Sequence, residues 1–113
     1  MFTISQRDIG DVTILDLSGR LTIAEGTLPF RDALRSLTDR DRRKIILNFA
    51  NVTHIDSSGI GELISAYTTL SNREGKLKLL NLPPSIEDVL RITKLLTIFE
   101  VFDDEFRAVG SFS

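Results

Sequence analysis

Short apolar runs alternate with amphipathic segments along this chain. Two runs near the beginning, residues 2–6 and 12–17, are separated by residues 7–11, whose polar and glycine content predicts a hairpin turn. Gly19 is expected to end the second strand. Apolar residues then recur at the spacing of one helical face from Thr27 onward and over residues 58–72. The remaining predicted elements are strands at 44–49, 76–81 and 98–102, a helix around 86–90, and a short helix after 103–105.

Strands that alternate with helices of ten to fifteen residues indicate an α/β fold. Right-handed crossovers then favour a mixed, mostly parallel sheet that opens with an N-terminal hairpin and carries helices after its strands. A length of 113 residues is typical of a single domain, so residues 1–113 are expected to form one unit. Only the tail at residues 110–113 is expected to fray.

The composition excludes several classes of function. A net charge of −2 with 27% charged residues gives no basic surface of the kind that binds nucleic acid directly. The absence of cysteine excludes thiol redox chemistry and disulfides. No run approaches the 18 or so apolar residues of a membrane span, and the first residues lack the pattern of a signal peptide, so a cytoplasmic location is expected.

Catalytic motifs are missing from the sequence. It contains no phosphate-binding loop, no dinucleotide-binding glycine pattern and no nucleophile elbow. The single histidine, His54, precedes Asp56 and Ser57, but residues this close in sequence are poorly placed for a catalytic relay, so a structural His54 is favoured. One histidine and scattered carboxylates give no metal-ligand spacing. We therefore expect no enzymatic activity, no metal and no cofactor.

The most informative motif runs from Asp56 to Gly61 and reads Asp-Ser-Ser-Gly-Ile-Gly. It lies where a predicted strand gives way to a predicted helix, so Ser57 and Ser58 fall at a helix N-terminus. Unpaired backbone N–H groups and the helix dipole favour an anionic oxygen there, whether as a capping side chain or as a covalently added phosphate. Glycine in a helix costs about 1 kcal/mol of stability relative to alanine, so the presence of Gly59 and Gly61 in this helix requires an explanation. Either the helix packs closely on the sheet, or the glycines leave a flat surface for another protein.

In this context the chain resembles the STAS domain family, and within it the bacterial anti-sigma factor antagonists. Residues 51–61 carry the resemblance most strongly, and residues 17–19, 45–49, 77–82 and 90–95 extend it over nearly the whole chain. The resemblance implies that the unphosphorylated protein binds an anti-sigma factor that is also a serine kinase, and thereby regulates sigma-dependent transcription. It implies that this kinase phosphorylates Ser57, which releases the partner, and that a serine phosphatase restores the first state.

The resemblance also implies a partner-binding surface. Gly59 and Gly61 are interpreted as clearance for the docking partner, and Ser58 as the helix cap. Members of the family commonly carry acidic residues where this chain has Arg20 and Thr22, so Arg20 is predicted to pair with Asp56 or with phosphorylated Ser57. The expected surface comprises Arg20, Thr22, Asp56, Ser57, Ser58, Gly59, Ile60 and Gly61.

Two other classes of function remain open at this point. Some STAS domains act as scaffolds or lipid-transport subunits, which a pulled-down partner would reveal. An autonomous nucleotide hydrolase is disfavoured, because no residue set here places a phosphate and a base together.

Overall fold

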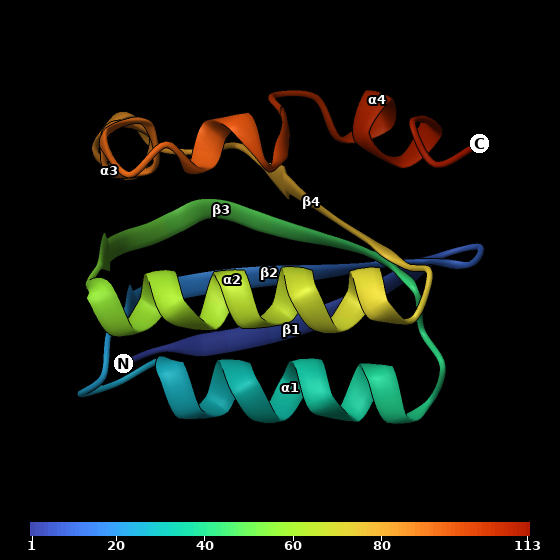
Figure 1. Cartoon of the computed structure of the whole chain (residues 1–113), viewed down its shortest axis with the longest axis horizontal. Coiled ribbons are helices and arrows are strands. Elements are labelled where there is room, and N and C mark those ends of the chain that lie inside the picture. Colours follow the sequence, from blue (N-terminus) through green and yellow to red (C-terminus); the bar gives the residue numbers. More distant parts are fainter.

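A computed structural model describes all 113 residues, Met1–Ser113 (Figure 1). The elements follow one another as β1 (Thr3–Ile9), β2 (Val12–Leu21), α1 (Thr27–Asp39), β3 (Lys44–Ile55), α2 (Ser57–Asn72), β4 (Lys76–Leu80), α3 (Pro84–Ile92), the 3-10 turn η1 (Leu95–Thr97), β5 (Glu100–Phe102) and α4 (Glu105–Gly110). None of the helices combines the length and the apolar character needed to cross a membrane.

The five strands form one sheet in the order β1-β2-β3-β4-β5. β1 is antiparallel to β2, and all later neighbours are parallel. The predicted α/β class, opening hairpin and mostly parallel sheet are therefore confirmed. Because each crossover moves one strand further in the same direction with the same hand, α1, α2 and α3 are brought to one face of the sheet. Figure 1 shows α1 and α2 side by side and running in the same direction.

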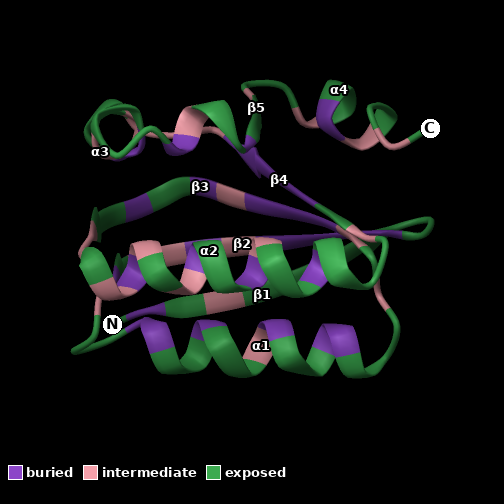
Figure 2. Cartoon of the chain, in the orientation of Figure 1, coloured by how far each residue is buried: buried purple, intermediate pink, exposed green.

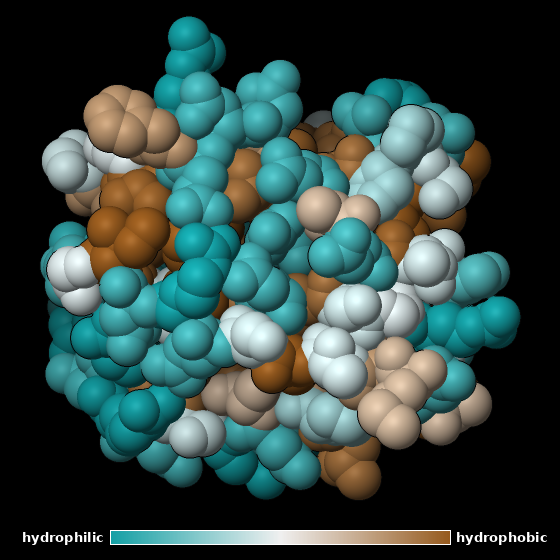
Figure 3. All heavy atoms as spheres, turned by 180° about the vertical axis from the view of Figure 1, so that it is seen from behind, coloured by the Kyte–Doolittle hydropathy of each residue, from teal (hydrophilic) through white to brown (hydrophobic).

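The sheet has two unequal faces. Twenty buried residues form the main core between the sheet and α1, α2 and α3. On the opposite face only five buried residues cluster, among them Ile14, Ile46 and Ala108 of α4. In Figure 2, purple buried positions alternate with green exposed ones along α1 and α2, so each helix turns only one side toward the core. Seen from behind, the surface is mostly hydrophilic with separate hydrophobic patches (Figure 3).

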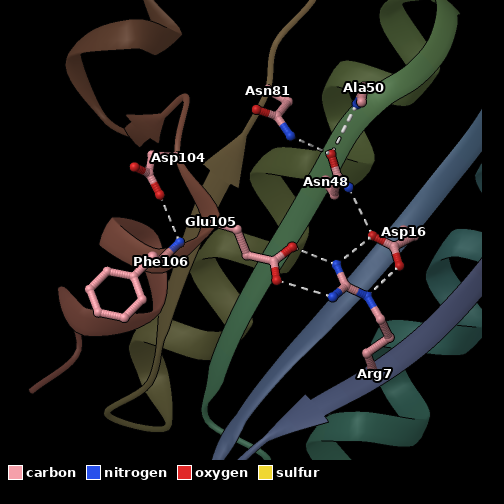
Figure 4. Close-up of polar contacts among 8 residues, drawn as sticks. All are labelled: Arg7, Asp16, Asn48, Ala50, Asn81, Asp104, Glu105 and Phe106. Atoms are coloured by element: carbon pink, nitrogen blue, oxygen red, sulfur yellow. Dashed lines mark hydrogen bonds and ion pairs between the residues drawn. The ribbon is translucent and has the colours of Figure 1, made fainter.

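A polar network covers part of the less buried face (Figure 4). The guanidinium of Arg7 on β1 donates to Asp16 on β2 at 2.6 and 3.1 Å and to Glu105 on α4 at 2.7 and 3.1 Å. Asn48 on β3 donates to the same Asp16 at 2.8 Å. Arg7 thus ties the first strand of the chain to its last helix.

Several predicted boundaries were wrong. β2 does not end at Gly19 but continues to Leu21, with a register shift between Gly19 and Arg20 and a φ of +104° at Gly19. A glycine tolerates this conformation, so the strand bends there without ending. β3 continues past Phe49 to Ile55 because its polar second half pairs with β2. The last strand is shorter than predicted, since the N–H groups of Ile98 and Phe99 donate back to the carbonyl of Leu95 in the turn η1 and do not join the sheet.

The fraying of residues 110–113 stays a prediction, but in the structure this tail contacts β4. The ammonium of Lys78, a β4 side chain only 2% exposed, donates to the hydroxyl of Ser111 at 2.7 Å and to its carbonyl at 3.2 Å. The same ammonium lies 4.4 Å from the centre of the Phe112 ring. A buried cation needs such partners: Glu100 of β5 supplies a carboxylate at 3.5 Å, and the tail supplies the hydrogen bonds and the aromatic ring.

Candidate functional site

The Asp56–Gly61 motif lies at the carboxyl end of β3, where the chain turns into α2. β3 ends at Ile55 and α2 begins at Ser57, so Asp56 is the single residue between them. β2 runs parallel to β3 and ends beside it at Leu21. The loop that follows β2, residues 22–26, therefore reaches the same edge of the sheet as the motif. The site is built from this loop and from the first turns of α2.

Asp56 caps α2. Its extended backbone, with φ −112° and ψ −177°, lets one carboxylate oxygen accept from the backbone N–H of Gly59 at 2.8 Å. The other oxygen accepts from the backbone N–H of Ile23 in the neighbouring loop at 3.0 Å. Hydrogen bonds from the Ile23 and Gly59 N–H groups, in that order, lower the pKa of the Asp56 carboxyl below its ordinary value. The prediction that Ser58 caps the helix was wrong, because Asp56 occupies that position.

The two serines differ in accessibility. Ser57 is exposed in the first turn of α2, whereas Ser58 is partly buried. No hydrogen bond holds either hydroxyl within the chain. Because Asp56 already serves as the cap, the hydroxyl of Ser57 is free to react or to contact another molecule.

Gly59 and Gly61 have different structural roles. A Cβ on Gly59 would overlap the carbonyl oxygen of Leu21 and would lie 2.8 Å from Cγ1 of Ile55, so Gly59 lets α2 pack against β2 and β3. A Cβ on Gly61 would meet no atom within 4 Å. The interpretation of Gly59 as clearance for a partner was therefore wrong, since that space is filled by the chain itself. Gly61 alone leaves an open surface.

Arg20 does not contact Asp56 in the structure. Arg20 is exposed on β2, opposite His54 of β3, and forms no ion pair. Its predicted pairing with Asp56 was wrong, because that carboxylate accepts from the backbone N–H groups of Ile23 and Gly59 and forms no ion pair. Its pairing with phosphorylated Ser57 stays a prediction. His54 is exposed, with its Nδ1 3.0 Å from the hydroxyl of Thr53, and forms no relay with Ser57.

Thr22 shapes the loop beside the motif. Its carbonyl accepts from the N–H groups of Glu25, Gly26 and Thr27 at 2.9 to 3.1 Å, and this turn presents the Ile23 N–H to Asp56. The contact at Ile23 could not be predicted from the sequence, because the donor is a main-chain N–H that any residue except proline could supply. It depends only on two strand ends meeting at one edge of the sheet.

Exposed apolar side chains occur in the loop after β2, at the start of α1 and on α2. Ile23 in the loop is 76% exposed, Leu28 at the start of α1 is 59% exposed, and Ile64 on α2 is 42% exposed. Ser57, Gly61 and Ile64 follow one another at the spacing of a single helical face, and all three are exposed. Ile60, by contrast, is partly buried and packs on the main core. We call Ile23, Leu28, Gly61 and Ile64 the apolar rim.

Comparisons with known proteins agree on the family. Residues 3–108 match the family model described as STAS domain. The anti-sigma F factor antagonist of Paenibacillus polymyxa is 24% identical over 98 residues, which cover 87% of this chain and 84% of that protein. The crystal structure of a candidate anti-sigma factor antagonist from Thermotoga maritima gives a TM-score of 0.89 at 24% identity, covering 96% of this chain and 92% of that one. The structure of the phosphorylated form of the Bacillus cell fate determinant SpoIIAA gives a TM-score of 0.76 at 21% identity, and the alignment covers both chains completely.

Proposed function

Because this chain belongs to the STAS domain family, we propose that it is an anti-sigma factor antagonist that works by binding another protein. The proposal is supported by the curated relative of that name. The observation that carries it is the exposed hydroxyl of Ser57 at the start of α2, which has no hydrogen-bond partner within the chain. The neighbouring Asp56 carboxylate already accepts from two backbone N–H groups.

In the proposed cycle, the unphosphorylated protein binds an anti-sigma factor and so releases a sigma factor. The partner is also a serine kinase that phosphorylates Ser57, and a serine phosphatase removes the phosphate. The apolar rim gives the partner side chains to bury, and Gly61 lets its backbone approach α2 closely. Asp56, Ser57 and Ser58 form the polar centre of this docking surface, with Arg20 and Thr22 at its border.

Phosphorylation acts in this scheme as a local change of charge. It adds about −1.5 to −2 charges at pH 7, next to the ionised carboxylate of Asp56. The N-terminus of α2 accommodates an anion, so the backbone is expected to change little. A docked partner would have to remove water from the phosphate or place its own groups against the added negative charge. A penalty of about 3 to 4 kcal/mol at the interface would weaken binding by roughly 100- to 1,000-fold.

Affinity capture with paired baits tests the proposed function. We expect the wild-type protein to capture an anti-sigma factor from a lysate of its source, and the Ser57→Asp protein to lose it. Thr68→Asp is a matched control, because it adds the same charge to an exposed position three turns further along α2. Capture of a membrane transporter by both baits, with no anti-sigma factor, would instead favour a transport-subunit function.

A labelling experiment tests the choice of serine. With the captured kinase and ATP, Ser57→Ala should abolish phosphate incorporation, whereas Ser58→Ala should retain it. Equal labelling of wild type and Ser57→Ala would overturn the assignment. Titration calorimetry of the partner with unmodified and phosphorylated protein then measures the predicted loss of affinity. Equal affinities for the two forms would refute the charge mechanism.

A further inference from the structure

A groove runs between α1 and α2 and is lined by residues of both helices. Figure 1 shows these two helices side by side and parallel. The volume of the groove is about 570 Å³, which is within the range of small-molecule sites. Phe30, Leu34 and Ala66 form its apolar floor. None of these residues belongs to the Asp56–Gly61 motif, so the groove is distinct from the docking surface proposed above.

Each end of the groove is closed by an arginine that already has a partner. At one end, Arg31 of α1 donates to the carboxylate of Glu62 on α2, with a shortest distance of 2.6 Å. At the other end, Arg73 donates to the carbonyl of Thr38 at 2.8 Å, which satisfies the last turn of α1. These two contacts hold the helices together and define the length of the groove.

The middle of the groove has polar groups without partners. Arg35 of α1 lines it, and the guanidinium of Arg35 forms neither an ion pair nor a hydrogen bond. From the opposite wall Ser65 and Thr69 of α2 line the same space, and their hydroxyls are also free of hydrogen bonds within the chain. One cation and two hydroxyls therefore lie above an apolar floor.

The charge of the groove favours an anion. Three guanidinium groups line it against two carboxylates, Glu62 and Asp39, and Glu62 is neutralised by Arg31. A guanidinium binds phosphate and carboxylate oxygens through paired N–H donors, and hydroxyls add further donors. Phe30, Leu34 and Ala66 meanwhile favour an apolar or aromatic group. We propose that this groove binds a small molecule in which a phosphate or carboxylate is joined to an apolar body.

Titration of the ¹⁵N-labelled full chain with phenyl phosphate tests this site by NMR. Amide shifts should concentrate at residues of α1 and α2 that line the groove, and should saturate at roughly millimolar concentration, as suits a fragment-sized ligand. Inorganic phosphate and phenol, each lacking one half of the ligand, should bind about tenfold more weakly. Benzoate distinguishes a carboxylate from a phosphate preference, and saturation by either anion supports the site.

Two variants provide the matched controls. Arg35→Met keeps a long side chain on an exposed helical position but removes the cation, so affinity should fall by about tenfold. Arg107→Met removes an exposed arginine from α4, outside the groove, and should leave affinity unchanged. The proposal is overturned if Arg35→Met binds as well as wild type. It is equally overturned if the shifts centre on Ser57, or if phenyl phosphate binds no better than inorganic phosphate.

Discussion

Two alanine substitutions only two residues apart should change stability in opposite directions. Gly59 and Gly61 both lie in the first turns of α2, so each gains about 0.5 to 1 kcal/mol of intrinsic helix preference when replaced by alanine. At Gly61 the added methyl meets no atom within 4 Å, and this gain remains. Gly61→Ala should therefore stabilise the protein by about 0.5 to 1 kcal/mol.

At Gly59 the same methyl has no space. It would overlap the carbonyl oxygen of Leu21 and would lie 2.8 Å from Cγ1 of Ile55. The first contact is to backbone, which cannot rotate away, so the start of α2 must move off β2. An overlap with backbone lies at the upper end of the cost of overpacking, at about 2 to 4 kcal/mol, and subtracting the helix gain of about 0.5 to 1 kcal/mol leaves a net loss. Gly59→Ala should therefore destabilise the protein by about 1 to 3 kcal/mol.

Thermal unfolding followed by circular dichroism, with urea unfolding as a second measure, checks both signs. Unfolding entropy of about 2.1 cal/mol/K per residue gives roughly 240 cal/mol/K for 113 residues. The expected shifts in Tm are then about +2 to +4 °C for Gly61→Ala and about −4 to −12 °C for Gly59→Ala. If the two variants shift in the same direction, the assignment of Gly59 to packing and Gly61 to open surface is refuted.

Three further predictions follow from other parts of the structure. Gly61→Trp should stay folded yet lose the anti-sigma partner in calorimetry, whereas Gly110→Trp, at an equally open position on α4, should bind normally; normal binding by Gly61→Trp would place the docking surface elsewhere. Hydrogen bonds from Arg7 lower the pKa of both the Asp16 and Glu105 carboxyls, so their contribution to stability is complete above the unfolded pKa of about 4 and is lost as pH falls through the lower folded pKa. Arg7→Met should accordingly reduce the urea midpoint most at about pH 7 and progressively less as the pH falls below about 4, and a reduction that does not change with pH would contradict this account. Removing Ser111–Ser113 should destabilise the protein by about 1 to 3 kcal/mol, because it takes partners from buried Lys78 and the packing of Phe112 from the smaller core cluster. Lys78→Met should make the same truncation less costly in a double-mutant cycle, and an unchanged cost would contradict the role given to Lys78.

The local pattern of the sequence was sufficient for the order of the elements and the place of the site. Apolar runs and helical spacing depend on neighbouring residues alone, so they indicated the α/β class, the opening hairpin and the position of the motif between β3 and α2. The exposure of Ser57 follows from the same pattern, because a residue in the first turn of a helix, off its apolar face, points to solvent.

Only the tertiary structure determined which groups distant in sequence are in contact. The polar second half of β3 is a strand because β2 pairs with it, and no apolar run in the sequence predicts that pairing. The second contact of the Asp56 carboxylate exists only because the loop after β2 brings the Ile23 N–H to it. Gly59 and Gly61 are identical in sequence terms, and only the approach of Leu21 to one of them separates packing from open surface. Lys78 is buried because the tail returns to cover it. Each of these depends on groups distant in sequence, whose proximity is fixed by the packing of the whole sheet and its helices.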